Sequence, residues 1–498
     1  MKQDELSGSH GTGSAGPLAS PPEGESRSAS GGSRFLPWVV ALAFFMQALD
    51  ITILNTALPG MARSLGENPL RMQSVVIAYM LTVALLIPAS GWLADRFGTR
   101  SMFVWAIALF TLGSLCCALS PNLPMLVVSR VLQGAGGALL LPVGRLVVLR
   151  AFPREQFLPV MSLIAIPSLV GPLIGPALGG FLVEYASWQW IFLINLPVGL
   201  LGMAAAKRYM PQFRSDTRRG FDGRGFLLFS AGLMLASLAL QSLGEHRVGA
   251  ALAVLGLAAG LALLAAYWLH AARHPQPLFN PAIFAISTYR IGVIGNLFAR
   301  LGSGATPFLT PLFLQLGLGF TPSQAGLAMI PAVLGAMLTK TWATRVIQHF
   351  GYRRVLVTNT LLLGLMIASF ALVPRGVSPI LLAIQLSVYG LFNSLQFTAM
   401  NALTLSDLGP DTASSGNSLL SVVMQLSMSL GVASSSLFLL FYSGGRFDQR
   451  SAEIDLLPAF HWTYVSAGAM AALAAFIFAQ LAPREGRVEA QASVLGED

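Results

Sequence analysis

The stretch Phe44–Pro59, FFMQALDITILNTALP, decides the fold of this chain. Most of its side chains suit hydrocarbon, yet Asp50 lies well inside the apolar run. An Asp at the centre of a membrane-spanning helix costs about 2.5–3.5 kcal/mol, so a carboxylate retained there serves to pair, to bind a ligand or to carry a proton. The alternative is an Asp near a helix end that reaches interfacial water. The stretch therefore predicts a spanning helix that carries a functional carboxylate.

Composition places the chain among polytopic membrane proteins. Of the 498 residues, 54% are hydrophobic and 10% are charged, whereas soluble domains average about 25% charged residues. The two cysteines, Cys116 and Cys117, are adjacent in an apolar run and are expected to be core residues. No disulfide, metal site or cofactor is predicted. A glycine pattern at 11–16, GTGSAG, has no strand before it and predicts no dinucleotide site.

Apolar segments long enough to cross a bilayer follow one another along the chain. The first begins only after 33 polar residues, so no cleavable signal peptide is predicted. The expected fold is an all-α polytopic membrane protein with 14 spans. They lie near 37–58, 73–94, 101–120, 124–149, 157–183, 189–208, 225–242, 249–270, 289–316, 324–347, 354–374, 379–402, 414–442 and 460–481.

Lysines and arginines are divided unequally between alternate loops. With the N-terminus inside, 21 of the 30 basic residues lie in inner loops and tails, and six lie in outer loops. The remaining three, Arg130, Arg145 and Arg300, fall inside spans. Because basic residues accumulate in cytoplasmic loops, both termini are predicted to be cytoplasmic. Topology thus accounts for the net charge of +9, and no nucleic-acid partner is predicted.

Two six-helix halves are predicted on either side of two linker helices. DRFGTR at 95–100 and QHFGYR at 348–353 match at Phe, Gly and Arg, and duplicated halves are common in secondary transporters. The expected domains are a disordered cytoplasmic tail at 1–34, an N-terminal half at 35–208, a cytoplasmic loop with two linker helices at 209–288, a C-terminal half at 289–482 and a cytoplasmic tail at 483–498.

The inner loop GWLADRFGTR at 91–100 combines glycines, an acid and basic residues at a helix end. Gly91 and Gly98 permit close packing and a tight turn. Asp95 can accept hydrogen bonds from an Arg or from the N-terminus of a helix in the other half. With Arg96 it would form a latch that breaks when the halves rock. For Arg96 and Arg100 individually, the alternative is an ordinary basic inner loop.

A second cation–anion arrangement involves RVLQGAGGA at 130–138, in the fourth span. If the first and fourth spans pack together, Arg130 meets Asp50 or Gln47. Burial and a nearby opposite charge change the proton affinity of a carboxylate in opposite directions. A change in the Asp50–Arg130 distance would therefore couple protonation to conformation. The alternative is a static buried ion pair that aids folding.

The fifth span contains GPLIGPALGG, with glycines at four-residue spacing on one helix face. Gly171, Gly175 and Gly179 predict close contact with a neighbouring helix. Pro172 and Pro176 predict kinks at which the helix could hinge. A generic face of small residues is the alternative.

Other polar residues lie scattered through the apolar spans. Asn195, in WQWIFLINLPVG at 188–199, is interpreted as a packing and positioning residue. The others either join helices or line a cavity, and both possibilities stay open. The candidates for a substrate cavity are Gln47, Gln133, Asn296, Arg300, Gln315, Asn393 and Gln396.

Taken in order, LDITILNTALP, GWLADRFGTR, RVLQGAGGA, GPLIGPALGG and WQWIFLINLPVG resemble the successive motifs of the major facilitator superfamily, over roughly residues 35–482. Fourteen spans resemble its drug:proton antiporter branch. The resemblance implies that Asp50 is the family's first-helix carboxylate, Arg130 its fourth-helix Arg, and Asp95 with Arg96 its inner-loop latch. The second copy of that loop has Gln348 where Asp95 stands, so it is assigned no latch role.

The expected function is proton-coupled export of small organic compounds, with multidrug efflux by alternating access. Two embedded cations, Arg130 and Arg300, favour an alternative, the export of one metabolite or of a metal-chelating organic anion. A remote alternative is a membrane sensor or enzyme without transport, but no nucleophile–base arrangement supports an enzyme. The expected partners are a small-molecule substrate, protons and the lipid bilayer. We expect a monomer that crosses the plasma membrane several times, in a bacterium the inner membrane.

Overall fold

The computed structural model describes residues 34–214, 220–245, 250–445 and 455–482, and helices are the only regular elements among them. All fourteen predicted segments lie on helices, so the all-α prediction is confirmed. Thirteen helical stretches are long and apolar enough to cross a membrane. Fourteen spans and the cytoplasmic position of the termini stay predictions. The predicted tails lie outside the described residues, apart from Arg34.

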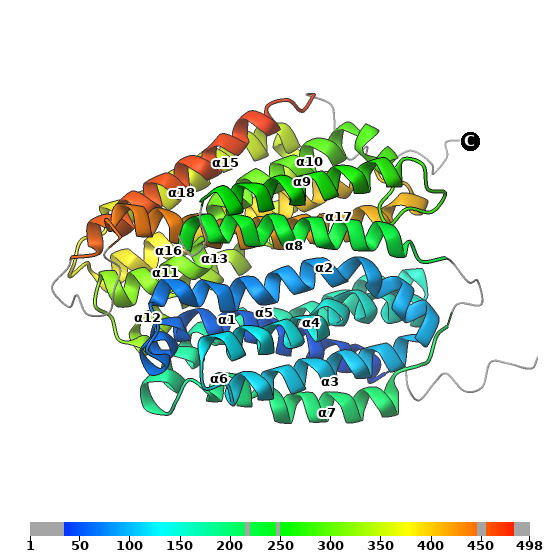
Figure 1. Ribbon diagram of the computed structural model, residues 1–498, viewed down its shortest axis with the longest axis horizontal. Coiled ribbons are helices and arrows are strands. Elements are labelled where there is room, and N and C mark those ends of the chain that lie inside the picture. The colour runs from blue at the N-terminus through cyan, green and yellow to red at the C-terminus, as the bar shows by residue number, and fades with distance from the viewer. Residues whose placement is uncertain (1–33, 215–219, 246–249, 446–454, 483–498) are drawn as a thin grey trace, which may run out of the picture.

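The N-terminal bundle comprises the helices that precede residue 210. Within it, α1 packs along α5, and α4 packs against α2 and α3. In Figure 1 this bundle is drawn in blue to teal. Its elements are α1 (Leu36–Leu65), η1 (Pro69–Met72), α2 (Gln73–Phe97), α3 (Thr99–Ala118), α4 (Leu123–Ala151), α5 (Arg154–Tyr185), α6 (Trp190–Leu193) and α7 (Asn195–Tyr209).

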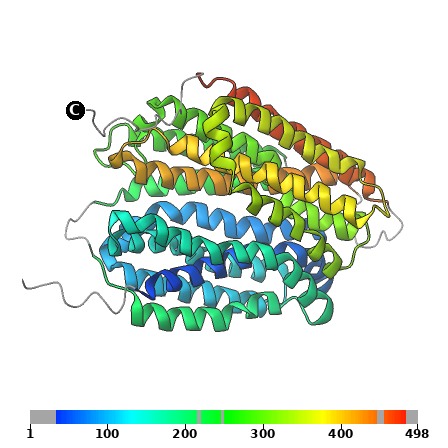
Figure 2. The ribbon, with the colours of Figure 1, turned by 180° about the vertical axis from the view of Figure 1, so that it is seen from behind.

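Two linker helices, α8 (Gly223–Glu245) and α9 (Ala250–Ala271), follow and pack along each other. Helix α8 contacts both α2 and α17, so it touches the helices on either side of it (Figure 1). The view from behind shows the N-terminal bundle lying beside the C-terminal bundle (Figure 2). The C-terminal bundle consists of η2 (Pro281–Ala285), α10 (Ser287–Ser303), α11 (Thr306–Leu312), η3 (Phe313–Gly317), α12 (Pro322–Ala328), α13 (Ile330–Thr339), α14 (Ala343–Phe350), α15 (Tyr352–Ser369), η4 (Phe370–Leu372), α16 (Pro379–Leu405), α17 (Pro410–Tyr442) and α18 (Leu457–Phe478).

The predicted segment 289–316 is divided into α10, α11 and the π-helical turn η3. Pro307 lacks the N–H that would bond to the carbonyl of Ser303, the last residue of α10. At η3 the N–H of Leu318 bonds to the carbonyl of Phe313, five residues earlier, at 2.9 Å, which is the spacing of a π-helical turn. None of these helices reaches the 18 residues taken as the shortest membrane-spanning length. This segment is therefore not among the thirteen candidate spans.

The repeated inner-loop motif folds alike in both bundles. Gly98 precedes α3 with φ +90°, and Gly351 precedes α15 with φ +77°. Residues with a side chain rarely adopt this backbone region, so glycine at both positions permits the turn. At Gly91 an added Cβ would meet nothing within 4 Å. Gly91 thus packs against no neighbour in this structure, the turn lies at Gly98, and the latch role of Gly91 stays a prediction.

Candidate functional site

Asp50 of α1 and Arg130 of α4 meet in the interior of the N-terminal bundle. Arg130 Nη1 lies 2.7 Å from Asp50 Oδ2, and each side chain is 1% exposed. Arg130 Nε donates to the carbonyl of Val75 at 3.3 Å, and the guanidinium carbon lies 4.4 Å from the centre of the Tyr79 ring. The guanidinium is thus held by an anion, a carbonyl and an aromatic face. The structure brings together the two charges that the sequence pattern paired.

The second oxygen of Asp50 is held by two amides. Gln133 Nε2 donates to Asp50 Oδ1 at 2.7 Å, and Asn195 Nδ2 donates to the same atom at 3.1 Å. Gln133 Oε1 accepts from Arg130 Nη1 at 2.7 Å, and Asn195 also donates to Ser114 Oγ at 3.0 Å. Hydrogen bonds to the charged form stabilise a carboxylate in a water-poor interior. We call Asp50, Arg130, Gln133 and Asn195 the Asp50 cluster.

Sequence reasoning did not place two members of the Asp50 cluster, Gln133 and Asn195, beside Asp50. Gln133 was predicted in a substrate cavity, and Asn195 was predicted to pack and position. Gln133 stands three residues after Arg130 in α4, on the same helix face, and that spacing was an available signal. Asn195 opens α7, which packs on α3 and α1. Its contact with Asp50 depends on this packing and has no local sequence signal.

The glycine face of α5 lies directly against α1, close to Asp50. An added Cβ at Gly171 would lie 2.8 Å from the backbone nitrogen of Leu49. Such short distances show that the helices approach through their backbones, as small-residue faces permit. Pro172 and Pro176 lie within the continuous helix α5, and their action as hinges stays a prediction. The face consists of Gly171, Gly175 and Gly179.

Asp95, near the C-terminal end of α2, pairs with a residue of its own bundle. Its Oδ1 lies 2.6 Å from Nη2 of Arg150 near the end of α4, and both side chains are about one-third exposed. Arg96 lies over the rings of Trp92 and Phe97, with centroid distances of 5.3 and 5.8 Å. This arrangement connects α2 to α4 within one bundle. A latch between the two bundles stays a prediction.

Arg300 of α10 is buried in the C-terminal bundle and is 7% exposed. Its Nε donates to Asn296 Oδ1 at 3.2 Å, and its guanidinium carbon lies 4.4 Å from the centre of the Phe397 ring. Among the described residues, Arg300 Nη2 has no hydrogen-bond partner and the side chain has no carboxylate partner. A buried cation without an anion is costly, so this position invites a functional explanation.

The remaining cavity candidates are spread over the molecule. Gln47 Nε2 donates to Tyr79 Oη and to the carbonyl of Gly137, both at 3.1 Å, and Tyr79 is also the ring under the Arg130 guanidinium. Gln396 is buried between α15 and α16, where it donates to Thr360 Oγ1 at 2.7 Å. Asn393 is half-buried on α16. The structure therefore does not bring the seven candidates together in one cavity.

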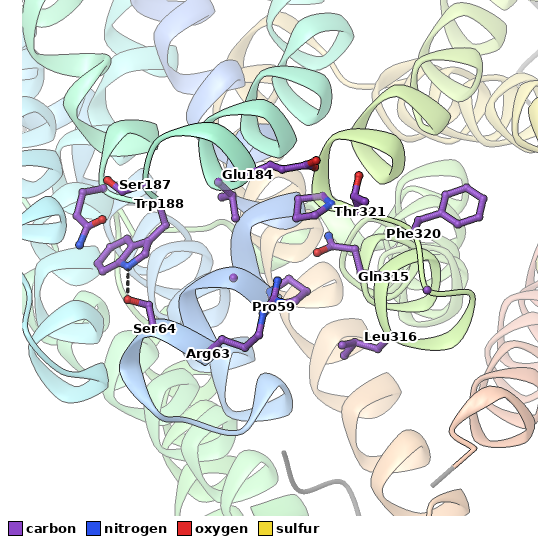
Figure 3. Close-up of a pocket in the computed structure, with 15 residues that line it drawn as sticks. Pro59, Arg63, Ser64, Glu184, Ser187, Trp188, Gln315, Leu316, Phe320 and Thr321 are labelled. Carbon is purple, nitrogen blue, oxygen red and sulfur yellow. Dashed lines mark hydrogen bonds between the residues drawn. The ribbon is translucent and has the colours of Figure 1, made fainter. Parts of the chain in front are cut away.

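Gln315 lines a cavity of about 1020 Å³ between the two bundles (Figure 3). The cavity lies where α1 and α5 end and α12 begins, which is the outer end of the bundles in the predicted orientation. Two hydrogen bonds cross between the bundles there, from Gln315 Nε2 to the carbonyl of Thr56 and from the Ser323 N–H to Glu184 Oε2, both at 2.9 Å. Asp50 is not part of the lining, so cavity and charged cluster are separate sites.

Known proteins resemble this chain over most of its length. The family model of the Major Facilitator Superfamily matches residues 40–224 and 292–495. A "Putative multidrug resistance protein MdtD" of Serratia proteamaculans is 51% identical over 449 residues, covering 89% of this chain and 92% of the relative. The protein of the same name from Escherichia coli is 50% identical over 454 residues, covering 90% and 95%.

Solved structures resemble the fold at much lower sequence identity. A POT family transporter in complex with a thioalcohol-conjugated peptide aligns with a TM-score of 0.67 and 16% identity, covering 89% of this chain and 95% of that one. A D-xylose-proton symporter aligns with a TM-score of 0.63 and 16% identity, covering 92% and 99%. Through its matched family model, its relatives and its helical architecture, this multi-pass membrane protein belongs to the major facilitator superfamily of transporters.

Proposed function

We propose that the protein is a proton-coupled exporter of small organic compounds that works by alternating access. The observation that carries the proposal is the Asp50–Arg130 pair, a titratable carboxylate and a fixed cation that are both 1% exposed inside a transporter fold. A buried ion pair adds little to stability compared with apolar packing, so stability alone is a weak reason to retain it. A role in carrying protons supplies a stronger reason.

The contacts suggest how protonation would act on the helices. Asp50 on α1 accepts hydrogen bonds from α4 through Arg130 and Gln133, and from α7 through Asn195. A proton on either oxygen removes the charge and turns one acceptor into a donor. In the proposed cycle, outward-facing Asp50 takes a proton and its link to Arg130 weakens. The halves then rock inward, where substrate displaces the proton.

The contacts between the bundles at the outer end suit such a movement. Two half-exposed hydrogen bonds, at Gln315 and at Glu184, cross between the bundles beside the cavity. Solvent can replace the partners of both bonds, so both can break within one transport cycle. We propose that the protein lies in a bacterial inner membrane with both termini in the cytoplasm, so that this end of the bundles faces outward. We also propose that a monomer carries out the cycle.

Relatives named multidrug resistance proteins support a broad range of drug-like substrates. The test uses the purified protein in proteoliposomes with an imposed pH gradient, ethidium as an organic cation, and a pH-sensitive dye inside. We expect gradient-driven ethidium movement accompanied by proton flux, and loss of both in Asp50→Asn. The matched control is Asp407→Asn, because Asp407 accepts a hydrogen bond only from Thr288 Oγ1 among the described contacts and lies between α16 and α17 of the other bundle. Undiminished coupled transport by Asp50→Asn would refute the role of Asp50.

Arg300 favours a second candidate, the export of a metabolite or metal-chelating organic anion. Its unpartnered Nη2 is a hydrogen-bond donor suited to a carboxylate. Carboxyfluorescein, an organic anion, serves as the probe beside ethidium in the same vesicles. Transport of the anion alone, lost in Arg300→Gln, would establish this candidate. Transport of ethidium alone, unchanged in that variant, would exclude it.

A further inference from the structure

Three metal-ligating side chains meet at the inner end of the linker helices. Asp222 immediately precedes α8, His270 lies in the last turn of α9, and His274 follows four residues later. One ligand atom from each residue lies within 4.8 Å of the others. No metal site was predicted from the sequence, in which 48 positions separate Asp222 from His270. The packing of α8 along α9 brings the three residues together.

The carboxylate of this trio is held in place before any ligand binds. Its side chain is 2% exposed, and His270 Nε2 lies 2.8 Å from Asp222 Oδ1. The Gly225 N–H donates to Oδ1 at 2.8 Å, and the Leu278 N–H donates to Oδ2 at 3.3 Å. Three contacts therefore fix the position of the Asp222 carboxylate beside the end of α9.

We propose that Asp222, His270 and His274 bind a divalent transition metal ion, with Zn²⁺ as its representative. Two imidazoles and one carboxylate are a donor set that Zn²⁺ accepts with water as fourth ligand, whereas Mg²⁺ and Ca²⁺ prefer all-oxygen sites. The metal would replace the proton between His270 and Asp222. Binding through His274 Nδ1 would break the bond that this atom accepts from the exposed Gln276 N–H at 3.2 Å, whereas binding through Nε2 would leave that bond in place.

The alternative is that Asp222 and His270 only tie α8 to α9 through their hydrogen bond. His274 distinguishes the two, because it takes no part in that bond and is required only for the metal. A bound ion would fasten the start of α8 to the end of α9. Through Leu278 it would also hold the segment that leads to α10. Since α8 contacts α2 and α17, the ion would stiffen the connection between the bundles, remote from Asp50.

The test is a zinc titration of the full-length protein, purified without a polyhistidine tag and stripped of metal. A chromogenic zinc chelator competes for the ion, and Co²⁺ absorption reports the ligand geometry. We expect one high-affinity site per chain, with affinity at least roughly tenfold weaker in His274→Ala and in the polar variant His274→Gln. The matched control is His349→Ala, at an exposed histidine of α14, which should bind as wild type.

Two results would overturn the proposal. One is wild-type protein that leaves zinc with the chelator and gives no tetrahedral Co²⁺ spectrum. The other is unchanged zinc affinity in both His274 variants, which would place any bound ion elsewhere. Thermal unfolding of each variant without metal shows whether it is folded. His274 is half-exposed, and its described contacts are one hydrogen bond from Gln276 and a ring contact with His270 at 5.1 Å, so we expect both variants to unfold close to the wild-type temperature.

Discussion

Asp50 and Arg130 form an ion pair that Gln133 closes into a ring. Arg130 Nη1 donates to both Asp50 Oδ2 and Gln133 Oε1, and Gln133 Nε2 returns a bond to Asp50 Oδ1, each at 2.7 Å. Every member is at most 1% exposed. The amide therefore contacts both charges at once. A change in the charge of Asp50 would alter all three bonds together, so we expect the three side chains to rearrange together.

Removing one charge of the Asp50–Arg130 pair should lower the stability of the protein more than removing both charges. Asp50→Asn leaves Arg130 charged and buried, which costs about 3–5 kcal/mol, whereas removal of both charges spares most of that penalty. We expect the apparent melting temperature in detergent to fall strongly in Asp50→Asn and to recover partly in Asp50→Asn/Arg130→Gln. Transport should remain absent in both. A double variant that melts as low as the summed losses would contradict this coupling.

Asn195 should contribute to the function of the Asp50 cluster and not only to packing. Asn195→Leu removes the donor to Asp50 Oδ1 and leaves Ser114 without its amide, at an expected cost of about 1–3 kcal/mol. We expect reduced proton flux in proteoliposomes. Ser114→Ala is the matched control, since it removes the Asn195–Ser114 bond and the bond from Ser114 Oγ to the carbonyl of Phe192, and keeps the bond to Asp50. Equal loss of flux in both variants would assign Asn195 a packing role alone.

The Asp50–Arg130 pair could be predicted from the sequence because a charged side chain in hydrocarbon has few favourable partners. An Asp and an Arg embedded in separate spans are each costly, so their pairing could be inferred before their positions were known. The helices followed from the same argument, since apolar runs in a bilayer satisfy their backbone groups internally. The glycine face of α5 carried its own signal through the regular spacing of Gly171, Gly175 and Gly179.

Other features depended on packing that no local pattern encodes. Asn195 reaches Asp50 because α7 lies against α1, and Asp222 reaches His270 because α8 lies along α9. Gln396 was placed in a cavity because an isolated polar residue shows no direction. In the structure it bonds to α15. The division of 289–316 was signalled by Pro307, but membrane helices often continue through proline, so the break was not evident.

The contact between α5 and α12 should control access to the outer cavity. An added Cβ at Gly326 would lie 2.9 Å from the Cα of Ala177, and one at Gly180 would lie 2.9 Å from the Cα of Ser323. Neither backbone can yield without the helices moving apart. We therefore expect Gly326→Val to separate the bundles at this end and to expose Gln315.

The measurement is the labelling rate of Gln315→Cys by a membrane-impermeant maleimide, in a background where Cys116 and Cys117 are replaced by alanine. We expect faster labelling when Gly326→Val is added. The matched control is Gly256→Val in α9, where an added Cβ would meet only the Ala239 Cβ at an ordinary 3.4 Å. If Gln315→Cys is labelled at the same rate with and without Gly326→Val, the α5–α12 contact does not close the cavity.

Arg300 should be retained for function at the expense of stability. Its guanidinium is 7% exposed, with Asn296 as its hydrogen-bond partner and no carboxylate beside it among the described residues. Replacing a buried unpaired charge with an apolar side chain of similar length removes its desolvation cost.

We expect Arg300→Met to raise the melting temperature while lowering transport of the preferred probe, and Arg300→Lys to keep the charge without the stability gain. This opposition between stability and activity is typical of residues in functional sites. Melting curves and vesicle transport on the same preparations supply both readings. A stabilised Arg300→Met protein that transports both probes at the wild-type rate would leave Arg300 without a role in the cycle.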